Sequence, residues 1–589
     1  MKAACNRLLH IFGEVQAECK DSTYELREYF HREIQQQPLA VLLIMSKLRN
    51  IVFITIAALA PLASGSAQAP PAQLAWHPWS ASVFAQARSE NKFVLLDLEA
   101  VWCHWCHVMD DVTYRDPAVV QLLNQRYLLV KVDQDARPDI SNRYQDYGWP
   151  ATVVFAADGS EIVKRQGYIA PLPMASMLQA IIDDPSPGPS VVRQEKFSPA
   201  AQAALDPALL QRIETEYEAQ YDQQASGWGQ GHKYLDSDAV EYALGLAARG
   251  NAEYAKRVAD TLHNAALLLD PAWGGMYQYS VGGRWSEPHF EKLISVQADA
   301  LRIYSLAYAQ TQNPEYLQVA QRVREYVKNF LTSPDGAFYV SQDADLVDGQ
   351  ENESYFKLPD RDRRAHGIPR IDKHLYSREN GEMIAALCDY YAATGETTAL
   401  DQAKRSTDWI VAHRSVAGGG FRHSGPESKG LYLGDTLAMG RAFLALYKVT
   451  GTRRYLTDAS SAERFIQLHF PPASSGTGYL TSSRTTDPTV LPLADRDENI
   501  ALVRLSSMLA AARGNAKMGL TATEAMRFLA AESVALLPPS AGILLANQDW
   551  TEAPLHVLIV GVPSAAARVS LHSAHQSNFS QRRSVCRQP

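Results

Sequence analysis

Two cysteines separated by two residues, Cys103 and Cys106, constrain what this chain can fold into more than any other feature. They lie in the stretch VWCHWCHVMDD, residues 101–111. Upstream, the apolar run FVLL is typical of a buried strand. Downstream, DPAVVQLLNQRY has the cap and first-turn preferences of a helix, with Asp116 as the N-cap. The pattern therefore places the pair after a strand and at the start of a helix, where helix amides and the helix dipole stabilise a thiolate.

The same stretch is compatible with four kinds of site. In a redox dithiol, Cys103 attacks a disulfide as a thiolate, and Cys106, on the same turn, resolves the mixed disulfide. The pattern C-x-x-C-H, ending at His107, also attaches c-type haem, and cysteine and histidine are common metal ligands. We expect neither haem nor metal, because the preceding strand does not suit an all-helical haem domain and no further ligand follows a regular spacing. An inert pair of buried cysteines is the fourth alternative.

The residues around the pair resemble a thioredoxin fold. Residues 97–103 match the pattern D-x-x-A-x-W-C, and GWPAT puts Pro150 where thioredoxins carry a cis-proline facing the active-site sulfurs. The resemblance implies that Asp97 is buried behind the dithiol and helps to move protons. The loop reads C-H-W-C instead of C-G-P-C, and a cation at His104 favours the thiolate, so we expect a more oxidising couple. The predicted catalytic residues are Cys103, Cys106, Asp97 and Pro150, and the predicted rim residues are Trp102, His104, Trp105, His107 and Trp149.

Local patterns predict the other elements of this domain. They are a helix over 80–92, a strand over 127–135, a β-hairpin that turns at Asp158-Gly159, and a closing helix over 171–183. A thioredoxin-like domain over 70–182 accounts for them. The stretch that follows is rich in Pro, Ser and Gly and predicts a linker over 183–202.

A helical repeat follows the linker. Its helices are apolar at i, i+3 and i+4 spacing, and glycine turns recur between them. Six helix pairs predict an (α/α)6 toroid over 203–563, with an open solenoid of helical hairpins as the alternative. The predicted fold class is therefore multidomain: an α/β thioredoxin-like domain followed by an all-α (α/α)6 toroid. A polar insertion at 341–373 is expected to be a loop on the toroid rim. The glycine turns are placed at Gly227, Gly275, Gly336, Gly420, Gly478 and Gly542.

The loops of this repeat carry polar and aromatic residues that a bare scaffold does not need. Carboxylates, a histidine and a tryptophan in a central cleft suit a carbohydrate-like ligand, through aromatic stacking and acid–base chemistry. Helix capping and rim salt bridges are the structural alternative. The predicted cleft residues are Arg284, Trp285, His289, Glu291, Gln342, Asp343 and Asp345.

Taken together, the two parts resemble the spermatogenesis-associated protein 20-like family. The resemblance covers Trp76 to Gly561 and rests on the C-H-W-C-H motif and on the segments RWSEPHFEK, GAFYVSQDAD and APLHVLIVG. It implies a thioredoxin-like domain joined to a six-hairpin toroid similar to sugar epimerases and glycosidases, and bacterial members include proposed exported disulfide reductases. The chain departs from the family at ENESYFKL, after DAD, and at residues 378–381, where RENG stands in place of Asp-Trp-Asn-Gly. Both departures weaken a catalytic role for the toroid.

The ends of the chain carry different signals. Residues 45–69 contain a basic region, an apolar region and an A-x-A site, in the order of a secretory signal, and the apolar run is short for a membrane span of about 30 Å. We therefore expect export to a bacterial periplasm, with no stable membrane anchor after cleavage, and we expect residues 1–44 to be a spurious extension before the true start. Residues 564–589 have no apolar period and predict a disordered tail. The net charge of −8 gives no support for nucleic-acid binding.

These patterns predict an exported thiol–disulfide oxidoreductase whose partner is a protein disulfide or dithiol. The alternative is a sugar-binding or sugar-processing toroid, epimerase-like or glycosidase-like, with the thioredoxin-like domain as an accessory. A scaffold that only docks partners is the third hypothesis.

Overall fold

The computed structural model describes residues 73–191, 197–350, 352–426, 430–483, 487, 489–514 and 519–552, together with the backbone of 555–560 and 583–588. The predicted extension (1–44) and signal segment (45–69) lie outside these residues. The chain divides into the units Met1–Ala69 and Pro70–Pro589, and all contacts given below lie inside the second unit. Among the described residues, no helix has the length and apolar character that crossing a membrane requires.

The first part of the chain contains a five-stranded sheet in the order β1-β3-β2-β4-β5. Strands β1, β3 and β2 are parallel, and β4 and β5 are antiparallel to their neighbours. In the central strand β2, Val94 and Leu96 belong to one core cluster and Leu95 to another, because successive side chains point to opposite faces. The strands are β1 Trp76–His77, β2 Phe93–Glu99, β3 Tyr127–Asp133, β4 Ala151–Phe155 and β5 Glu161–Gln166.

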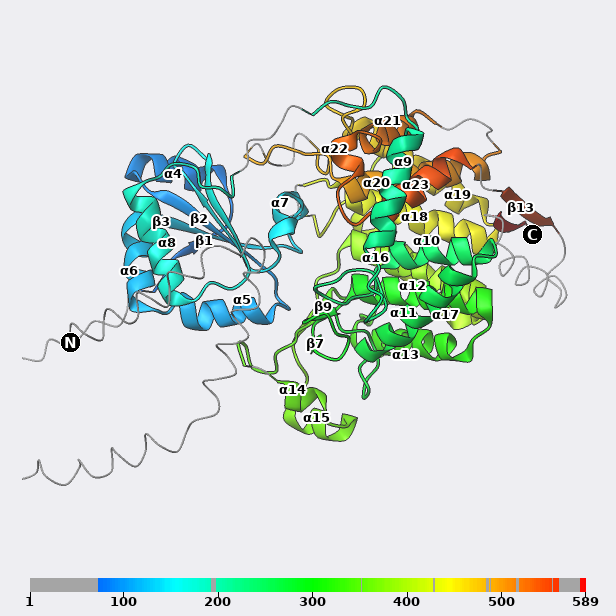
Figure 1. The fold of residues 1–589 in the computed structure, drawn as a ribbon, viewed down its shortest axis with the longest axis horizontal. Helices are drawn as coiled ribbons and strands as arrows, with labels where there is room; N and C mark the ends of the chain where they lie inside the picture. Colours follow the sequence, from blue (N-terminus) through cyan, green and yellow to red (C-terminus); the bar gives the residue numbers. More distant parts are fainter. Residues whose placement is uncertain are drawn as a thin grey trace, which may run out of the picture. The chain divides into compact units, whose positions relative to one another are not determined.

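Helices cover both faces of this sheet (Figure 1). Side chains of α4 and α7 pack with one face, and side chains of α6 and α8 pack with the other. The strand order and the three layers define a thioredoxin-like α/β domain, so this prediction is confirmed. The helices are α4 Ala81–Glu90, α5 His104–Val108, which continues as a π-helical turn Met109–Thr113, α6 Pro117–Arg126, α7 Pro138–Tyr144, followed by a 3-10 turn Gln145–Tyr147, and α8 Pro171–Asp183.

Two local predictions in this domain are confirmed. Asp116 caps α6, and its carboxylate accepts hydrogen bonds from the amides of Ala118 and Val119. The hairpin of β4 and β5 turns at Asp158 and Gly159, and Gly159 has a φ of +92°, a conformation that L side chains rarely adopt.

The second part of the chain is a closed ring of helices. The inner helices α10, α12, α16, α18, α20 and α23 each contact the next, and α23 contacts α10. Five outer helices follow their inner partners in sequence, whereas α9, at the start of the ring, pairs with α23 at its end. The ring is therefore an (α/α)6 toroid and not an open solenoid. Figure 1 shows its helices gathered in one body. The inner helices are α10 Ser237–Ala248, α12 Ile294–Thr311, α16 Ser377–Thr394, α18 Leu433–Thr450, α20 Arg496–Ala512 and α23 Ala541–Thr551. The outer helices are α9 Pro207–Ala219, α11 Ala252–Ala265, α13 Pro314–Phe330, α17 Thr397–Arg414, α19 Arg453–His469 and α21 Leu520–Leu529.

Burial separates the two layers of the toroid. The inner helix α18 is buried over most of its length, whereas the outer helix α13 buries one apolar side and exposes the other. Gly395 and Gly451 end α16 and α18 in the left-handed conformation, which explains the glycine that follows each of these long helices.

Short elements connect the helices of the toroid. A 3-10 turn, Ala266–Leu268, follows α11, and the short helix α22 Glu532–Ala535 follows α21. The strands are β6 Tyr279–Ser280 paired with β7 Pro288–His289, β11 Ser415–Val416 paired with β12 Gly420–Phe421, and β8 Lys292–Leu293, β9 Ser341–Gln342 and β10 Ile371–Asp372 in one small sheet.

Three details differ from the sequence-based expectations. Gly542 lies inside α23 and not in a turn: a Cβ there would lie 2.9 Å from the Asp238 carboxylate and 3.0 Å from Ile500, so this glycine permits close helix packing. The insertion at 341–373 is not a bare loop, because it contains α14 Glu353–Phe356 and α15 Asp360–His366 and two strands of the small sheet. Within the segment expected to be disordered, β14 Arg583–Gln588 pairs in parallel with β13 Leu555–Val560, through backbone hydrogen bonds that need no apolar period.

Candidate functional site

The dithiol lies where β2 leads into α5. Cys103 is the N-cap of α5, and its Sγ accepts a hydrogen bond from the amide of Cys106 at 3.2 Å. The two residues form a disulfide, and both are buried, with 4% and 3% of their surface exposed. An N-cap sulfur lies at the positive end of the helix, so the site is built to stabilise a Cys103 thiolate after reduction.

Asp97 lies on β2, the strand that leads to the dithiol, and its side chain is buried. Its Oδ1 has no hydrogen-bond partner among the described residues, and its Oδ2 lies 3.5 Å from the Lys131 ammonium. Burial raises the pKa of the Asp97 carboxyl to about 8; Lys131 opposes this rise, and the neighbouring carboxylate of Glu99 adds to it. Asp97 can therefore gain or lose a proton near neutral pH, which is what its predicted role requires.

The aromatic residues of the motif differ in exposure. Trp102 is 3% exposed, donates a hydrogen bond from Nε1 to Asp135 at 2.8 Å and meets Trp149 edge to face. The Trp149–Pro150 peptide bond is cis, as the resemblance to thioredoxins implies. Trp105 is 38% exposed and lies beside the ring of Tyr168, so it forms the open part of the predicted rim.

Both histidines of the motif bind a carboxylate supplied by the toroid. His104 Nδ1 lies 2.7 Å from one oxygen of Asp345, and His107 Nδ1 lies 3.0 Å from the other. Burial opposes protonation of His107, but the hydrogen bond to Asp345 and the charge of Asp343 outweigh it and raise the pKa of the imidazole. The pKa of Asp345 falls to about 2, because the two histidines more than offset the effect of burial.

Arg370, which lies in the insertion at 341–373 together with Asp345, also contacts the loop that carries the cysteines. The Arg370 guanidinium donates to the carbonyl of Val101 and to Asp343, both at 2.9 Å, and lies 3.0 Å from His107 Nε2. Leu293, at the end of β8, packs against the cluster that contains both cysteines. Asp343 and Asp345 were predicted to line a toroid cleft, and this placement is wrong: both lie at the dithiol, because the insertion folds onto the thioredoxin-like domain.

Two groups of residues in the described part of the chain have the spacing of metal ligands. One group is His107, Asp343 and Asp348, and the other is Asp97, Glu99 and Asp110. A cation of the protein already lies among each of them: Arg370 in the first and Lys131 in the second. Neither group therefore carries a metal-site proposal.

The other predicted cleft residues have structural contacts. Trp285 is 4% exposed and donates from Nε1 to the carbonyls of Ala225 and Ser226. Arg284 and Glu287 form an exposed pair at 3.6 Å. The remaining three have these contacts: His289 stacks on Tyr279, Glu291 is buried 3.9 Å from His289, and Gln342 accepts from the Tyr326 hydroxyl at 3.0 Å. These contacts are those of capping and rim packing, although Glu291 Oε2 and Gln342 Nε2 are buried without a hydrogen-bond partner among the described residues. That these five residues line a cleft stays a prediction.

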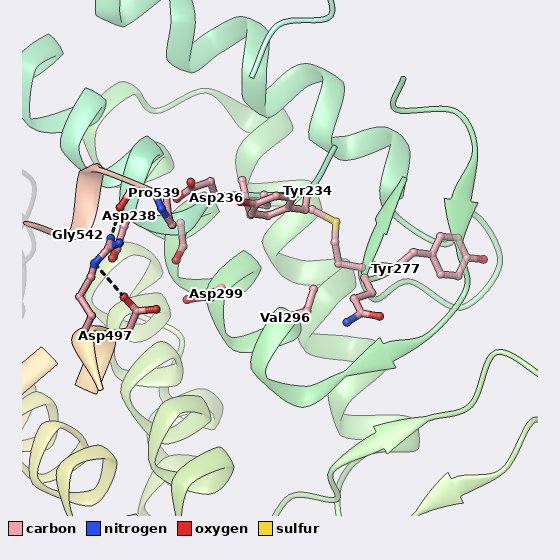
Figure 2. Close-up of a pocket in the computed structure, with 14 residues that line it drawn as sticks. Tyr234, Asp236, Asp238, Tyr277, Val296, Asp299, Asp497, Pro539 and Gly542 are labelled. Carbon is pink, nitrogen blue, oxygen red and sulfur yellow. Dashed lines mark hydrogen bonds and ion pairs between the residues drawn. The ribbon is translucent and has the colours of Figure 1, made fainter. Parts of the chain in front are cut away.

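The toroid does contain a cavity, at the N-terminal ends of its inner helices. A hollow of about 300 Å³ is lined by charged residues of α10, α12, α16, α18 and α20, and by Asn142 and Gln145 from the thioredoxin-like domain. An adjoining pocket shares Asp238, Asp299 and Asp497 with it. Figure 2 shows Asp236, Asp238 and Asp299 around one end of this pocket and Tyr277 at the other. The charged residues of the main cavity are Asp238, Asp299, Arg302, Arg378, Glu382, Arg441, Asp495, Asp497, Glu498 and Arg504.

Some carboxyl groups around the cavity have raised pKa values. Burial raises the pKa of Glu498 to about 8 and of Asp236 to about 7. Titratable groups in this range can act as acids or bases near neutral pH.

None of these cavity residues was predicted from the sequence. They come from five helices that are far apart along the chain. Asp238, Asp495, Asp497 and Glu498 lie at helix starts, where acidic residues are expected for capping alone, whereas Arg302, Arg441 and Arg504 lie near the middle of their helices. A usable signal was the recurrence of charged residues within the first halves of the long apolar helices, for example Asp299 in α12 and Glu382 in α16.

The fold and the dithiol together define a thioredoxin-like domain joined to an (α/α)6 toroid. Two family models match the chain in the same order. Residues 66–181 match Thioredox_DsbH, described as a protein of unknown function, DUF255. Residues 301–526 match the beta-L-arabinofuranosidase GH127 catalytic domain.

Relatives confirm the resemblance to the spermatogenesis-associated protein 20-like family. The mouse spermatogenesis-associated protein 20 is 24% identical over 309 residues, which are 46% of this chain and 38% of the mouse protein. An uncharacterized protein of Caenorhabditis elegans is 23% identical over 551 residues, covering 72% of this chain and 75% of that protein. The thiol:disulfide interchange protein DsbD of Campylobacter jejuni is 28% identical over 89 residues, covering 14% of this chain and 15% of that protein.

Solved structures are similar to each part of the chain. A sugar epimerase from a ruminal bacterium has a TM-score of 0.42 at 14% identity and covers 55% of this chain and 86% of its own. A thioredoxin from Thermus thermophilus has a TM-score of 0.18 at 22% identity and covers 19% of this chain and 88% of its own. At these TM-scores, the fold assignment rests on the strand order and helix contacts of this chain.

Proposed function

We propose that this protein is a thiol–disulfide oxidoreductase whose redox couple is Cys103 and Cys106. The observation that carries the proposal is the position of Cys103 as the N-cap of α5, after the strand that holds the buried Asp97. The match to Thioredox_DsbH and the similarity to DsbD support it.

The chemistry follows from this geometry. In the reduced form, the Cys103 thiolate attacks one sulfur of a partner's disulfide, and the partner's other sulfur leaves as a thiolate. Cys106 then loses its proton to Asp97, directly or through water, and attacks Cys103, which releases the partner as a dithiol. The two electrons leave the Cys103–Cys106 pair, which ends as the disulfide seen in the structure. A dithiol donor restores the reduced form by the same steps in reverse.

Trapping of mixed disulfides tests the assignment of the two cysteines. The Cys106→Ser variant should accumulate a mixed disulfide at Cys103, because the resolving thiol is missing, and Cys103→Ser should accumulate none. Mass spectrometry of each variant after exposure to a small disulfide reads the result. If neither variant is trapped and the wild type reduces no disulfide, the proposal fails.

A second function is favoured by the cavity of the toroid. A hollow lined by carboxyls, one of them of raised pKa, and by arginines suits a hydroxyl-rich ligand, and the GH127 match over 301–526 supports a carbohydrate-like one. A thermal-shift screen of the full chain with mono- and disaccharides tests this proposal. A rise in melting temperature with a saccharide supports it, and the absence of a rise with every saccharide counts against it.

We also propose that the protein is exported, on the strength of the signal-like segment at 45–69. N-terminal sequencing of the protein from the periplasm of its host should find Pro70 or a neighbour as the first residue. Recovery of the chain with residues 1–44 intact would contradict both the export signal and the proposed start at Met45.

A further inference from the structure

We propose that the toroid cavity binds a small, hydroxyl-rich anion of the sugar-acid class, and that Arg441 binds its carboxylate. The proposal rests on the second function above, the binding of a carbohydrate-like ligand by the toroid, and specifies the charge of that ligand. The cavity adjoins Asn142 and Gln145, so the ligand also touches the thioredoxin-like domain.

Arg441 is the cation of the cavity that lacks a partner. It lies on α18 and lines the hollow, yet it makes no hydrogen bond or ion pair with any residue that the structure describes. Its neighbours Arg302 and Arg504 are both bound to Glu241, at 2.6 Å and 3.2 Å. Burial, Arg504 and Arg302 lower the pKa of Arg441, because they disfavour a further positive charge and outweigh the carboxylates of Glu382 and Asp238, which favour it. An anion at this place would remove that penalty.

Glu498 supplies a second, independent sign of a ligand. It is 7% exposed and lines the cavity, and its Oε2 has no hydrogen-bond partner among the described residues. Because its pKa is raised, the carboxyl is protonated at neutral pH and can donate a hydrogen bond. A buried group of this kind costs free energy unless a ligand satisfies it.

The remaining side chains fit hydroxyl groups. The carboxylates of Asp238, Asp299 and Glu382 are 38%, 49% and 26% exposed, so each has oxygens available to accept hydrogen bonds. A volume of about 300 Å³ lies at the small end of the range for ligand sites. Among the described residues that line this cavity, none is aromatic, so ring stacking does not contribute and hydrogen bonds and charge must select the ligand.

Calorimetry with the full chain tests the charge of the ligand. Glucuronate, glucose and glutamate are titrated separately at pH 7 into the wild type and into Arg441→Gln. The wild type should bind glucuronate about tenfold more tightly than glucose, because a paired carboxylate adds a charge-assisted hydrogen bond. Arg441→Gln should lose this preference and keep its affinity for glucose, whereas Arg441→Lys should retain part of it.

Arg454→Gln is the matched control, since Arg454 is 67% exposed on the outer helix α19. It should bind glucuronate as the wild type does, and unchanged circular dichroism and melting temperatures without ligand will show that each variant is folded. Equal affinities for glucose and glucuronate would overturn the inference and leave the carbohydrate proposal standing. Binding of glutamate alone would overturn both, as would the absence of binding by either sugar. An unchanged preference in Arg441→Gln would overturn the role of Arg441.

Discussion

Asp97 combines three properties that are rarely found together in a carboxyl group: burial, an oxygen without a partner among the described residues, and a pKa near 8. A carboxylate with a purely structural ion pair would have a low pKa, whereas the contact of Asp97 with Lys131 does not offset the effect of burial. The side chain is therefore suited to move protons for the resolving cysteine, which is the role proposed above.

Asp97→Asn tests this role. Because an amide cannot accept the Cys106 proton, reduction of a small disulfide should slow by about 100-fold, within the usual range for general-base catalysis. The pH–rate profile should lose its inflection near 8. Glu90→Gln is the control, since Glu90 is exposed at the end of α4 and is not among the groups that shift the pKa of Asp97. A rate for Asp97→Asn equal to that of the control would contradict the role.

His423 predicts a pH dependence of stability. It is buried, lies 2.9 Å from Asp435 and binds the carbonyl of Asp135 at 2.6 Å. Burial opposes its charge, but Asp435 and Glu379 outweigh burial and raise its pKa from 6.5 to about 9. A pKa raised in the folded state stabilises the fold fully below pH 6.5, and this contribution disappears as the pH rises through 9.

The free energy of unfolding in urea measures this contribution. Between pH 6 and pH 9.5, the wild type should lose roughly 3 kcal/mol more than His423→Gln does. Comparing the two proteins cancels the contribution of Asp97, whose raised pKa also lowers stability as pH rises. Parallel curves for the two proteins would show that His423 is neutral in the folded chain.

Residue patterns predicted the dithiol because its neighbours in space are also neighbours in sequence. Residues 97–103 and Pro150 carry the thioredoxin pattern within one local unit. Asp345 was misplaced for the opposite reason: it is more than two hundred residues from His104, and only the folding of the insertion brings them to 2.7 Å.

At the scale of elements, the insertion at 341–373 covers the dithiol. Asp345 and Arg370 bind the loop that carries the cysteines, and Leu293 of the adjacent strand packs on them. A small disulfide therefore reaches the cysteines more readily than a protein does. A protein partner has to displace the insertion at 341–373.

Asp345→Asn should weaken the cover. Loss of the charge-assisted hydrogen bonds to both histidines should speed reaction with a protein disulfide such as insulin by about tenfold, relative to a small disulfide. Asp360→Asn is the control, because Asp360 lies in the same insertion and bonds to Arg364 and Trp273 instead. Equal ratios in the two variants would argue against a covering role.

Helices and strands were predicted where local signals agree. Asp116 with Pro117 predicted the start of α6, and Asp158-Gly159 predicted the hairpin. The turn predicted at Gly542 was wrong, because the sequence does not distinguish a glycine needed for close packing of helices from one needed for a turn.

At the scale of the whole molecule, α9 and α23 close the toroid from opposite ends of its sequence. The number of helix pairs indicated a ring, but closure between these two helices depends on contacts that no local pattern records. The charged cavity follows from closure, because it is lined by the starts of inner helices that only the ring brings together.

Ile213→Ala tests closure. Ile213 is fully buried in α9, so its truncation should cost about 2–5 kcal/mol. Hydrogen exchange should then accelerate in α23 as well as in α9, because the two helices support each other. Val323→Ala in α13 is the control and should affect α13 and α12 but leave α23 protected. Unchanged protection of α23 in Ile213→Ala would contradict a closed ring.

In the intact chain, Cys103 and Cys106 should form a reversible two-electron couple. Equilibration of the full-length protein in a series of dithiothreitol redox buffers, followed by alkylation and mass spectrometry of the peptide that contains both cysteines, tests it most directly. One transition is expected, in which both cysteines change together and which is reached equally from the oxidised and the reduced side. Cysteines that stay oxidised or stay reduced across the whole series, or that fail to re-form their disulfide, would contradict it.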